Sequence, residues 1–441
     1  MSVRTGALLA TMVMLAATFA GCGSGQSGSP GQGLEASAAC STTLTPSSGA
    51  STLASAIVSA PDGSTICLAS GRYPFIHVVG AAHASYVTLR SAPGATATLT
   101  EGMEVANSSF LRVEGLHLSG APAGIDMRDS PGYPGSRDYQ LIDDTFEDDA
   151  YGIALDGAGA GPIKDVLIER DVMRNIDWAG AGCRAGYADG QAVTLEDSEG
   201  VTITHNSFKE VSWHFIQGGG AGPEGVTVEH NLFEGPIPAS RRACTHLNVW
   251  QIFAGGENNT FANNIVRGEP GNPASITPLL FETETSSGKC TGTMSNTTVS
   301  NNLFVYADAA YSIQIMTTHG LTVKDNTVVG SKYGTTVYNE PKCALGTNYD
   351  VSHNIDVGNE SGADMSLGGC EGACTFEYNV TEDASAERAG GAGSHYVVDW
   401  SPSWASTSWD PTKKPSVPTD YYHPIGLPFW AGYEGSGSGG P

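Results

Sequence analysis

The sequence has few charged residues, and basic residues are the scarcest. Of its 441 residues only 15% are charged, with 21 lysines and arginines against 46 aspartates and glutamates, so the formal net charge is −25. This balance argues against nucleic acid as a partner, because a phosphate backbone attracts basic surfaces. The low charge content also disfavours a helical bundle, whereas 57 glycines and 23 prolines suit frequent turns between short strands.

Long apolar runs are also scarce, because no run of 18 apolar residues occurs after the N-terminus and no later segment is expected to span a bilayer. The apolar stretch 7–20 follows Arg4 and leads into Ala-Gly-Cys at 20–22. This pattern predicts a secretory signal peptide over residues 1–21. Ala-Gly-Cys resembles a bacterial lipobox, which implies cleavage before Cys22 and lipidation of its thiol. An ordinary signal peptide is the alternative.

The stretch after the lipobox, GSGQSGSPGQG, predicts a flexible tether within residues 22–39. We therefore expect an exported protein that faces outward and is held at the bacterial cell membrane by its lipid alone. A folded domain is expected over 40–435, a disordered tail over 436–441, and a monomeric state.

No two cysteines have the CxxC spacing that is typical of metal sites. Eight cysteines remain after Cys22, and in an exported protein an even number indicates disulfides. The sequence alone does not determine which cysteines pair with which. The preferred ones are Cys40–Cys67, Cys183–Cys244, Cys290–Cys343 and Cys370–Cys374.

A short pattern recurs along most of the chain. VTITHNSF (201–208) returns as VTVEHNLF, NTFANNIV, TTVSNNLF, LTVKDNTV, YDVSHNID and CTFEYNVT, and the intervals between the shared asparagines are 25, 33, 38, 24, 28 and 25 residues. Self-similarity with variable insertions predicts a solenoid whose units bury their apolar faces by stacking.

Each repeat divides into three short strands. VTIT-type runs alternate apolar and polar residues, and the Asn that follows is expected to turn a corner in left-handed backbone conformation. His205 is then a surface corner residue, and Phe208 begins a second strand and stacks on Phe233. A third strand appears as GIALD, AVTLE, HFIQG, NVWQI, PLLFE, SIQI and TTVYN. Three strands per repeat predict about ten coils of a parallel β-helix.

These residues resemble right-handed parallel β-helix proteins of the pectin-lyase-like superfamily over roughly residues 40–435. The segment 53–75 looks like that superfamily's opening, an amphipathic capping helix and a first strand, and 420–435 looks like a degenerate closing coil. The resemblance implies an all-β, right-handed parallel β-helix solenoid with a short N-terminal capping helix. It also implies a substrate cleft along the third strand of each coil.

The rung Ser-Ile-Gln-Ile sets the parity of this third strand. Ile313 and Ile315 must face inward, so Gln314 faces outward. Stacking the other rungs on it predicts one outward polar row as the substrate floor; a purely structural ladder is the alternative. The predicted row is Asp156, Glu196, Gln217, Gln251, Glu282, Gln314 and Asn339.

Two long loops carry a basic cluster: Arg184 in 177–190, and Arg241, Arg242 and His246 in 234–247. Such a cluster suits an acidic glycan, because a cation neutralises the uronate carboxylate while a base removes the C5 proton in β-elimination. The base is predicted to be His246 or His214, and Arg241 or Arg242 neutralises the carboxylate. Alternatively, the arginines only solubilise the loop and His214 packs at a strand edge.

Lyases of this superfamily often hold calcium with several carboxylates. Two acidic groups are candidates: DDTFEDD (143–149), and Glu282 with Glu284. The second group is expected nearer the cleft, so Glu282 and Glu284 are the predicted ligands.

The sequence also departs from the superfamily's better-defined enzymes. It lacks the paired aspartates and Gly-His-Gly of the polygalacturonase branch and the Trp-Ile-Asp-His of the pectate-lyase branch. THLNVWQIFAGG (245–256) resembles a His-x-Asp-x-x-Gln rung of exported members, with Asn248 in place of Asp.

Two hypotheses follow from these patterns. The first is a surface-anchored protein that binds and cleaves an acidic polysaccharide as a lyase. The second is a non-catalytic glycan-binding or structural cell-surface protein on the same scaffold. An adhesive or antifreeze-like solenoid needs a regular threonine face, and the threonines look scattered along the sequence.

Overall fold

The structure is a computed structural model of the chain. It describes residues 39–129, 135–157, 161–177, 190–219, 222–235, 248–253, 255–268, 278–283, 285–286, 289–290, 292–305, 311–358, 365–381, 395–396, 403–404 and 424–425. The signal peptide, Cys22, the tether and the tail 436–441 lie outside these residues. Cys40–Pro441 forms a compact unit of its own. Among the described helices, none has the length and apolar character needed to cross a bilayer.

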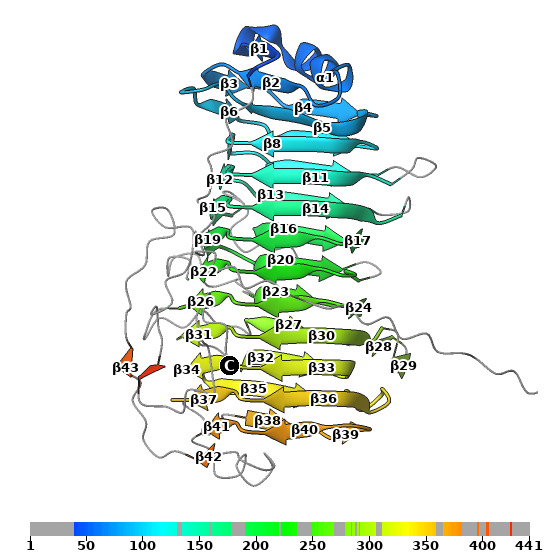
Figure 1. Ribbon diagram of the computed structural model, residues 1–441, viewed down its shortest axis with the longest axis vertical. Coiled ribbons are helices and arrows are strands. Elements are labelled where there is room, and N and C mark those ends of the chain that lie inside the picture. The colour runs from blue at the N-terminus through cyan, green and yellow to red at the C-terminus, as the bar shows by residue number, and fades with distance from the viewer. Residues whose placement is uncertain are drawn as a thin grey trace, which may run out of the picture. The chain divides into compact units, whose positions relative to one another are not determined.

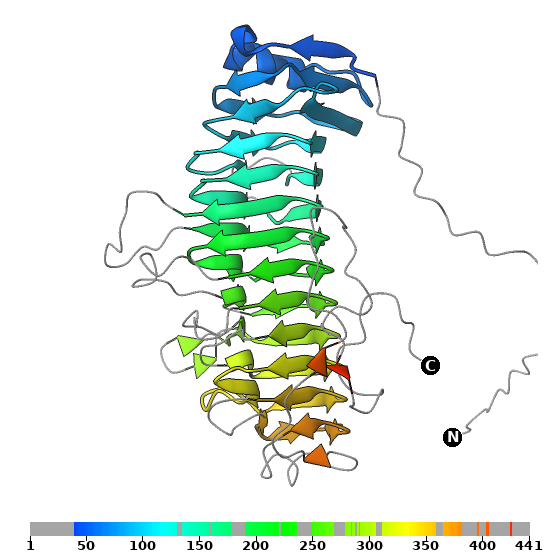
Figure 2. The same cartoon turned by 90° about the vertical axis from the view of Figure 1, so that its left-hand side faces the viewer.

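Three long parallel sheets, called A, B and C here, make up this unit (Figures 1 and 2). The 16 strands of sheet A are β1 (Thr42–Leu44), β2 (Thr65–Leu68), β5 (Ala82–Ser91), β8 (Ser109–Glu114), β11 (Arg137–Ile142), β14 (Ile163–Glu169), β17 (Ser198–Glu199), β18 (Thr202–Thr204), β21 (Thr227–Glu229), β24 (Gly256–Glu257), β25 (Thr260–Ala262), β30 (Met294–Ser300), β33 (Thr318–Lys324), β36 (Gly346–Ser352), β39 (Cys370–Glu371) and β40 (Thr375–Glu377). The 13 strands of sheet B are β3 (Gly71–Tyr73), β6 (Ala97–Leu99), β9 (His117–Ser119), β12 (Thr145–Glu147), β15 (Val172–Ile176), β19 (Ser207–Val211), β22 (Leu232–Glu234), β26 (Ile265–Arg267), β31 (Leu303–Val305), β34 (Thr327–Val329), β37 (Ile355–Val357), β41 (Val380–Thr381) and β42 (His395–Tyr396). The 11 strands of sheet C are β4 (Ile76–Val79), β7 (Met103–Ala106), β10 (Ile125–Arg128), β13 (Tyr151–Asp156), β16 (Gln191–Glu196), β20 (His214–Gly219), β23 (Asn248–Ile252), β27 (Leu279–Phe281), β32 (Tyr311–Met316), β35 (Tyr333–Tyr338) and β38 (Met365–Leu367).

Successive strands of the chain visit the three sheets in turn. β18, β19 and β20 pair in parallel with β21, β22 and β23 of the next coil. This arrangement confirms the parallel β-helix, and the 11 strands of sheet C agree with the prediction of about ten coils.

The N-terminal end is covered by a short 3-10 turn, Pro46–Ser48, and by helix α1 (Ala50–Val58). Leu53 and Ile57 of α1 are buried, and the helix packs on β4. The predicted capping helix is therefore confirmed. Of the predicted closing coil, 420–435, the structure describes only β44 (Pro424–Ile425), which pairs antiparallel with β43 (Ser403–Trp404). A second small antiparallel pair joins β28 (Thr285–Ser286) to β29 (Lys289–Cys290).

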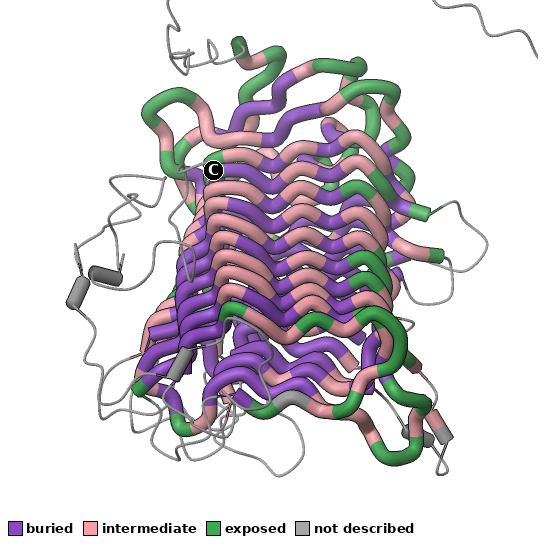
Figure 3. Tube along the Cα trace, turned by 60° about the horizontal axis from the view of Figure 1, so that its bottom comes forward, coloured by how far each residue is buried: buried purple, intermediate pink, exposed green. Residues whose placement is uncertain are grey.

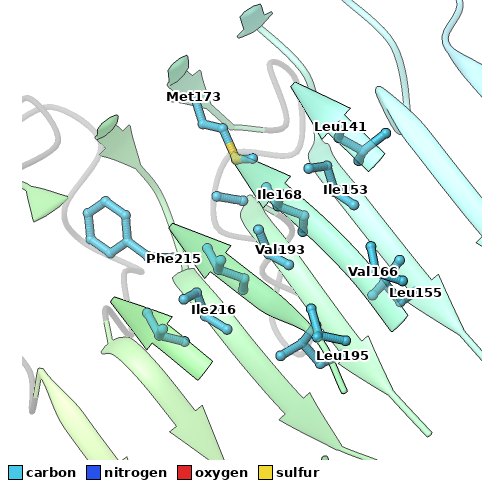
Figure 4. Packing of buried hydrophobic residues seen from close by; sticks show 14 of the residues in the cluster. Leu141, Ile153, Leu155, Val166, Ile168, Met173, Val193, Leu195, Phe215 and Ile216 are labelled. Atoms are coloured by element: carbon cyan, nitrogen blue, oxygen red, sulfur yellow. The ribbon is translucent and has the colours of Figure 1, made fainter. Parts of the chain in front are cut away.

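The core is a column of apolar side chains enclosed by the three sheets. Buried and partly exposed residues alternate around each coil (Figure 3). Ile153, Val193 and Ile216 lie in register on successive rungs of sheet C and pack inside (Figure 4). Phe208 stacks on Phe233 with ring centroids 4.8 Å apart, as predicted.

Three of the four predicted disulfides are present. Cys40–Cys67, Cys290–Cys343 and Cys370–Cys374 are bonded. The predicted pair Cys183–Cys244 lies outside the described residues.

Buried asparagines form a ladder at the corner between sheets A and B. The Oδ1 of each accepts the backbone N–H of the asparagine one rung earlier, as Asn231 does from Asn206 at 2.8 Å and Asn264 does from Asn231 at 2.9 Å. Each Nδ2 donates across the corner, so that of Asn231 bonds the Ile203 carbonyl at 2.8 Å. The ladder therefore pairs backbone groups that the turn would otherwise leave unsatisfied. Its asparagine members are Asn206, Asn231, Asn264, Asn302, Asn326, Asn354 and Asn379.

The prediction that Asn206 adopts the left-handed conformation is wrong. That conformation belongs to the preceding residue, His205 with a φ of 59° and His230 with a φ of 56°. The side chain of Asn206 must point inward to reach its ladder partners, so the residue before it makes the turn. The His205 and His230 rings stack on the outside at 5.1 Å, which confirms His205 as a corner residue.

Aspartates occupy two further ladder positions at the N-terminal end. The Oδ1 of Asp171 accepts the Asp144 backbone N–H at 2.7 Å, as an asparagine would. Its Oδ2 is buried and has no donor within the described residues. Burial raises the pKa values of Asp144 and Asp171 well above 3.8, and repulsion from Asp144 adds to the shift at Asp171. The fold therefore favours the protonated acid, which can donate where an asparagine Nδ2 would.

Replacing Asn206 by valine is expected to lower the free energy of unfolding by roughly 3 kcal/mol, because buried groups on two neighbouring rungs lose their partners. Urea denaturation measures the change. His205→Asn is the matched control and should change stability little, since Asn263 and Asn301 hold the same conformation at equivalent corners. An unaffected Asn206→Val variant would contradict the structural role of the ladder.

Asp171→Asn is expected to stabilise the protein at pH 8 and to flatten its pH dependence. Because the folded pKa is raised above 3.8, the unfolded chain loses the proton first as the pH rises. Stability is therefore greatest below about pH 4 and falls as the pH rises toward the folded pKa. The gain in the free energy of unfolding should therefore be larger at pH 8 than at pH 4.5.

Thermal unfolding at pH 4.5 and pH 8 measures this difference. Asp165→Asn, at an exposed position with a φ of 56°, is the control and should change the pH dependence less than Asp171→Asn does. A pH dependence that Asp171→Asn does not alter would show that the buried acid is not the cause.

Candidate functional site

The outward face of sheet C carries polar residues in two rows, one of which holds Arg128, Asp156 and Glu196, so the single predicted row is wrong. The parity is as predicted, because Ile313 and Ile315 are buried. Gln217 pairs with Gln251, and Leu280 lies between Gln251 and Gln314. The first row, called the amide row, is Thr194, Gln217, Gln251, Leu280, Gln314 and Thr336.

The acidic residues of the prediction lie elsewhere. Asp156 pairs with Glu196, but Glu196 pairs with Gly219, two residues after Gln217. Glu282 follows the last residue of β27. Asn339 lies past the end of β35, where its Oδ1 accepts the Gly346 backbone N–H at 2.8 Å. The prediction placed the last polar residue of every strand in one row, whereas β20 continues past Gln217.

A hydrogen-bonded chain of polar side chains lies at the middle of sheet C. Asn248 Nδ2 donates to Gln251 Oε1 at 2.9 Å, and Gln251 Nε2 donates to Glu282 Oε2 at 3.1 Å. Asn248 is also in register with His214 on the previous rung. We call His214, Asn248, Gln251 and Glu282 the central cluster. It brings together three of the predicted site residues, and Asn248 joins them.

His214 is 1% exposed, and its ring lies 5.2 Å from that of Trp213. A general base must come within hydrogen-bonding reach of the proton it removes. Burial therefore argues against His214 as the base and for its packing role. Arg241, Arg242 and His246 lie outside the described residues.

Gln217 differs from Gln251 in its hydrogen bonds. Its side chain is half-buried, and its Oε1 is buried and accepts no hydrogen bond from the described residues. It lies directly beside Gln251, whose own amide is used by Asn248 and Glu282. Gln251 thus holds the cluster together, whereas Gln217 can meet a ligand only through the exposed part of its side chain.

Carboxylates dominate the N-terminal half of the same face. Asp126 is paired with Arg128 at 2.6 Å, and Glu104 contacts His77 at 3.3 Å. The pKa of Glu196 is raised above its ordinary value by burial first and then by repulsion from neighbouring carboxylates. Glu104 and Asp126 continue the amide row through Ala154, so the row is uncharged only from Ala154 to Thr336.

The described residues alone do not form the predicted calcium site. Within them no group of three or more His, Cys, Asp or Glu side chains is placed to hold a metal ion. Glu282 is engaged by Gln251, and Glu284 lies outside the described part of the chain. Calcium takes six to eight oxygen ligands, and one carboxylate does not supply them.

Sheet A carries a regular row of threonines that was not predicted from the sequence. The expectation of scattered threonines is therefore wrong. Thr202, Thr227, Thr260, Thr298 and Thr322 lie in register on five successive rungs. The signal was present in the repeat, because each of these threonines precedes its ladder asparagine by four residues. It becomes visible once the asparagines are known to set the register.

Comparison with solved structures agrees with this fold. A mutant of the PL6 family alginate lyase AlyGC superposes with a TM-score of 0.54 at 12% identity, covering 90% of this chain, which spans 57% of that one. The surface adhesin PfbA of Streptococcus pneumoniae gives 0.47 at 11% identity, covering 74% of this chain and 90% of its own. An alginate lyase from Paenibacillus sp. str. FPU-7 gives 0.44 at 18% identity, with coverages of 69% and 97%.

No family model and no curated protein matches the sequence. At identities this low, structural similarity establishes the fold alone.

Gln251→Ala is expected to lower the free energy of unfolding by roughly 1–3 kcal/mol, because Asn248 and Glu282 lose a buried partner. Gln217→Ala, one rung away, is the control and should change stability by less than about 0.5 kcal/mol. Chemical denaturation of both variants measures the difference. Equal losses in the free energy of unfolding would contradict the larger structural role that the hydrogen bonds assign to Gln251.

Proposed function

We propose that this chain is an exported, lipid-anchored β-helix protein that binds an acidic polysaccharide along the outward face of sheet C. The observation that carries the proposal is the row that holds the amides Gln217, Gln251 and Gln314 in register, with Gln251 bonded in the central cluster and Gln314 Nε2 donating to the Tyr338 hydroxyl at 3.1 Å. Amide groups donate and accept hydrogen bonds, as sugar hydroxyls require. Gln217 and Gln314 are partly exposed and lie three rungs apart in this row, so they offer a polymer two contacts along its length, with the buried Gln251 between them.

The acidic character of the glycan rests on Arg241 and Arg242. In the sequence they belong to the segment between β22 and β23, and β23 carries Asn248 and Gln251. A guanidinium group is suited to a carboxylate because it offers two parallel donors. These arginines would also offset the repulsion between a uronate and the carboxylates Asp156 and Glu196.

Cleavage by β-elimination is the further step that this site is proposed to perform. Arg241 or Arg242 would neutralise the uronate carboxylate and so acidify the C5 proton. His246, two residues before Asn248 in the sequence, would remove that proton. The C4–C5 double bond would form as the bond from C4 to the leaving oxygen breaks, and the leaving oxygen would take a proton from water. Calcium held by Glu282 and Glu284 would supply the same neutralisation when bound.

The burial of His214 favours the second candidate, a glycan-binding protein without catalysis. With His214 inaccessible, the lyase reaction depends on His246 as its base. The two candidates share the binding face and differ only in the chemistry, so one experiment separates them.

The test uses residues 40–441 with pectate, alginate and chondroitin sulfate, each with and without calcium. Affinity electrophoresis reports binding, and ultraviolet absorbance of the unsaturated uronate reports elimination. We expect binding that weakens at least tenfold in Gln217→Ala and in the double variant Arg241→Ala/Arg242→Ala. We expect product formation that His246→Ala abolishes and His205→Ala leaves unchanged.

Two negative results have different meanings. Binding without any unsaturated product would exclude the lyase and leave the non-catalytic glycan-binding protein. Absence of binding to all three acidic glycans would exclude both.

A further inference from the structure

Sheet A presents a second face whose chemistry differs from that of sheet C. The five in-register threonines Thr202, Thr227, Thr260, Thr298 and Thr322 are half-buried and point outward from β18, β21, β25, β30 and β33. After one interruption by Asp350, Thr375 continues the row. None of these six hydroxyls makes a hydrogen bond in the described part of the chain. We call them the threonine row.

A groove of about 490 Å³ lies at the C-terminal end of this row. Thr298, Thr322 and Thr375 line it, together with Asn296 and Asn348 on its flank. Gly320 creates the hollow, because it lies in register between Asn296 and Asn348 and has no side chain. A Cβ at Gly320 would come within 2.8 Å of Asn296 Oδ1.

The groove and the row are pre-organised for hydrogen bonding. Threonine is stiff about χ1, and the parallel ladder fixes each hydroxyl one rung from the next. Little side-chain freedom is then lost when a ligand binds. Apart from Asp350, the row and the asparagines beside it carry no charge, although the protein as a whole has a formal net charge of −25.

We propose that the threonine row and its terminal groove bind a neutral polysaccharide lying along the helix axis. A chain of uncharged sugars matches a row of hydroxyl and amide groups, since each sugar presents several hydroxyls. Its residues repeat at roughly the spacing of the rungs, about 4.8 Å. This site is separate from sheet C and takes a ligand of different charge.

Ice is the other ligand that a regular threonine row could bind. The positions two residues further along the same strands hold Glu229 on β21 and Lys324 on β33. Their charged side chains are strongly hydrated and interrupt a flat uncharged surface. The observations therefore favour the flexible polymer.

The test measures retention of the full-length protein in gels that contain hydroxyethylcellulose or laminarin, with alginate for comparison. The triple variant Thr298→Val/Thr322→Val/Thr375→Val removes three hydroxyls and keeps the branched shape that suits a strand. We expect it to bind the neutral glycan at least tenfold more weakly. Thr145→Val on sheet B is the matched control, because Val172 holds the same position on the next rung.

A second variant, Gly320→Asn, fills the groove without removing any hydroxyl. It should fold, since Asn296 and Asn348 hold the same left-handed conformation on the adjacent rungs, with φ of 50° and 57°. It is expected to weaken neutral-glycan binding at least tenfold. Circular dichroism and the thermal midpoint confirm that each variant is folded.

Three results would overturn the proposal. They are no retention by either neutral glycan, retention unchanged in the triple variant, and retention lost in Gln217→Ala on sheet C as strongly as in the triple variant. Thermal hysteresis that the triple variant abolishes, without glycan binding, would assign the face to ice instead. Failure here leaves the sheet C proposal untouched, because that one is tested on acidic glycans with other variants.

Discussion

The structure depends on one interaction, the hydrogen bonds that a buried asparagine side chain makes to the rungs on both sides of it. An amide has both a donor and an acceptor, so a column of identical amides satisfies itself and the backbone at every turn, as Asn231 does between Asn206 and Asn264. Polar groups buried without partners would cost far more than the turn gains. This requirement fixes the corners from Asp144 to Asn379, and the corner fixes which residues of the next strand face outward.

Because the same asparagine recurs in seven repeats, the ladder was also the feature that the sequence displayed most clearly. The asparagine spacing was sufficient to predict a solenoid of three-stranded coils, and helix α1 was implied by the resemblance of the segment 53–75 to a known β-helix opening. Three disulfide pairings were also correct. The backbone conformation of the corner was not predictable from residue preference. Asparagine favours the left-handed region, yet here the turn falls on His205 and even on Tyr378, which has a φ of 58°, because the asparagine is needed inside.

The candidate site was harder to predict because sheet C begins after the insertions that vary most in length. Nothing in the sequence marks where β20 or β23 starts relative to its neighbours, so Glu196 was aligned with Gln217 although it pairs with Gly219. The chain of hydrogen bonds from Asn248 through Gln251 to Glu282 depends on that register. In the sequence, Asn248 stands where the resembling rung has an aspartate, so a possible acid appears to be missing. In the fold, its amide donates the hydrogen bond that the Gln251 Oε1 accepts.

A stacked fold repeats every outward position at about 4.8 Å, and this repetition constrains which side chains a row can hold. Glu199, Glu224 and Glu257 lie on successive rungs, and like charges at that spacing repel by roughly 1–3 kcal/mol per pair. Lys164 pairs with Glu199 and relieves one end of that row. Neutral rows carry no such penalty, so the threonines of sheet A and the amides of sheet C extend over several coils. A row that repeats without penalty is also the arrangement that a polymer of repeating units can contact at many points. The same rule that keeps the coils in register therefore gives this protein two long uncharged tracks on different faces.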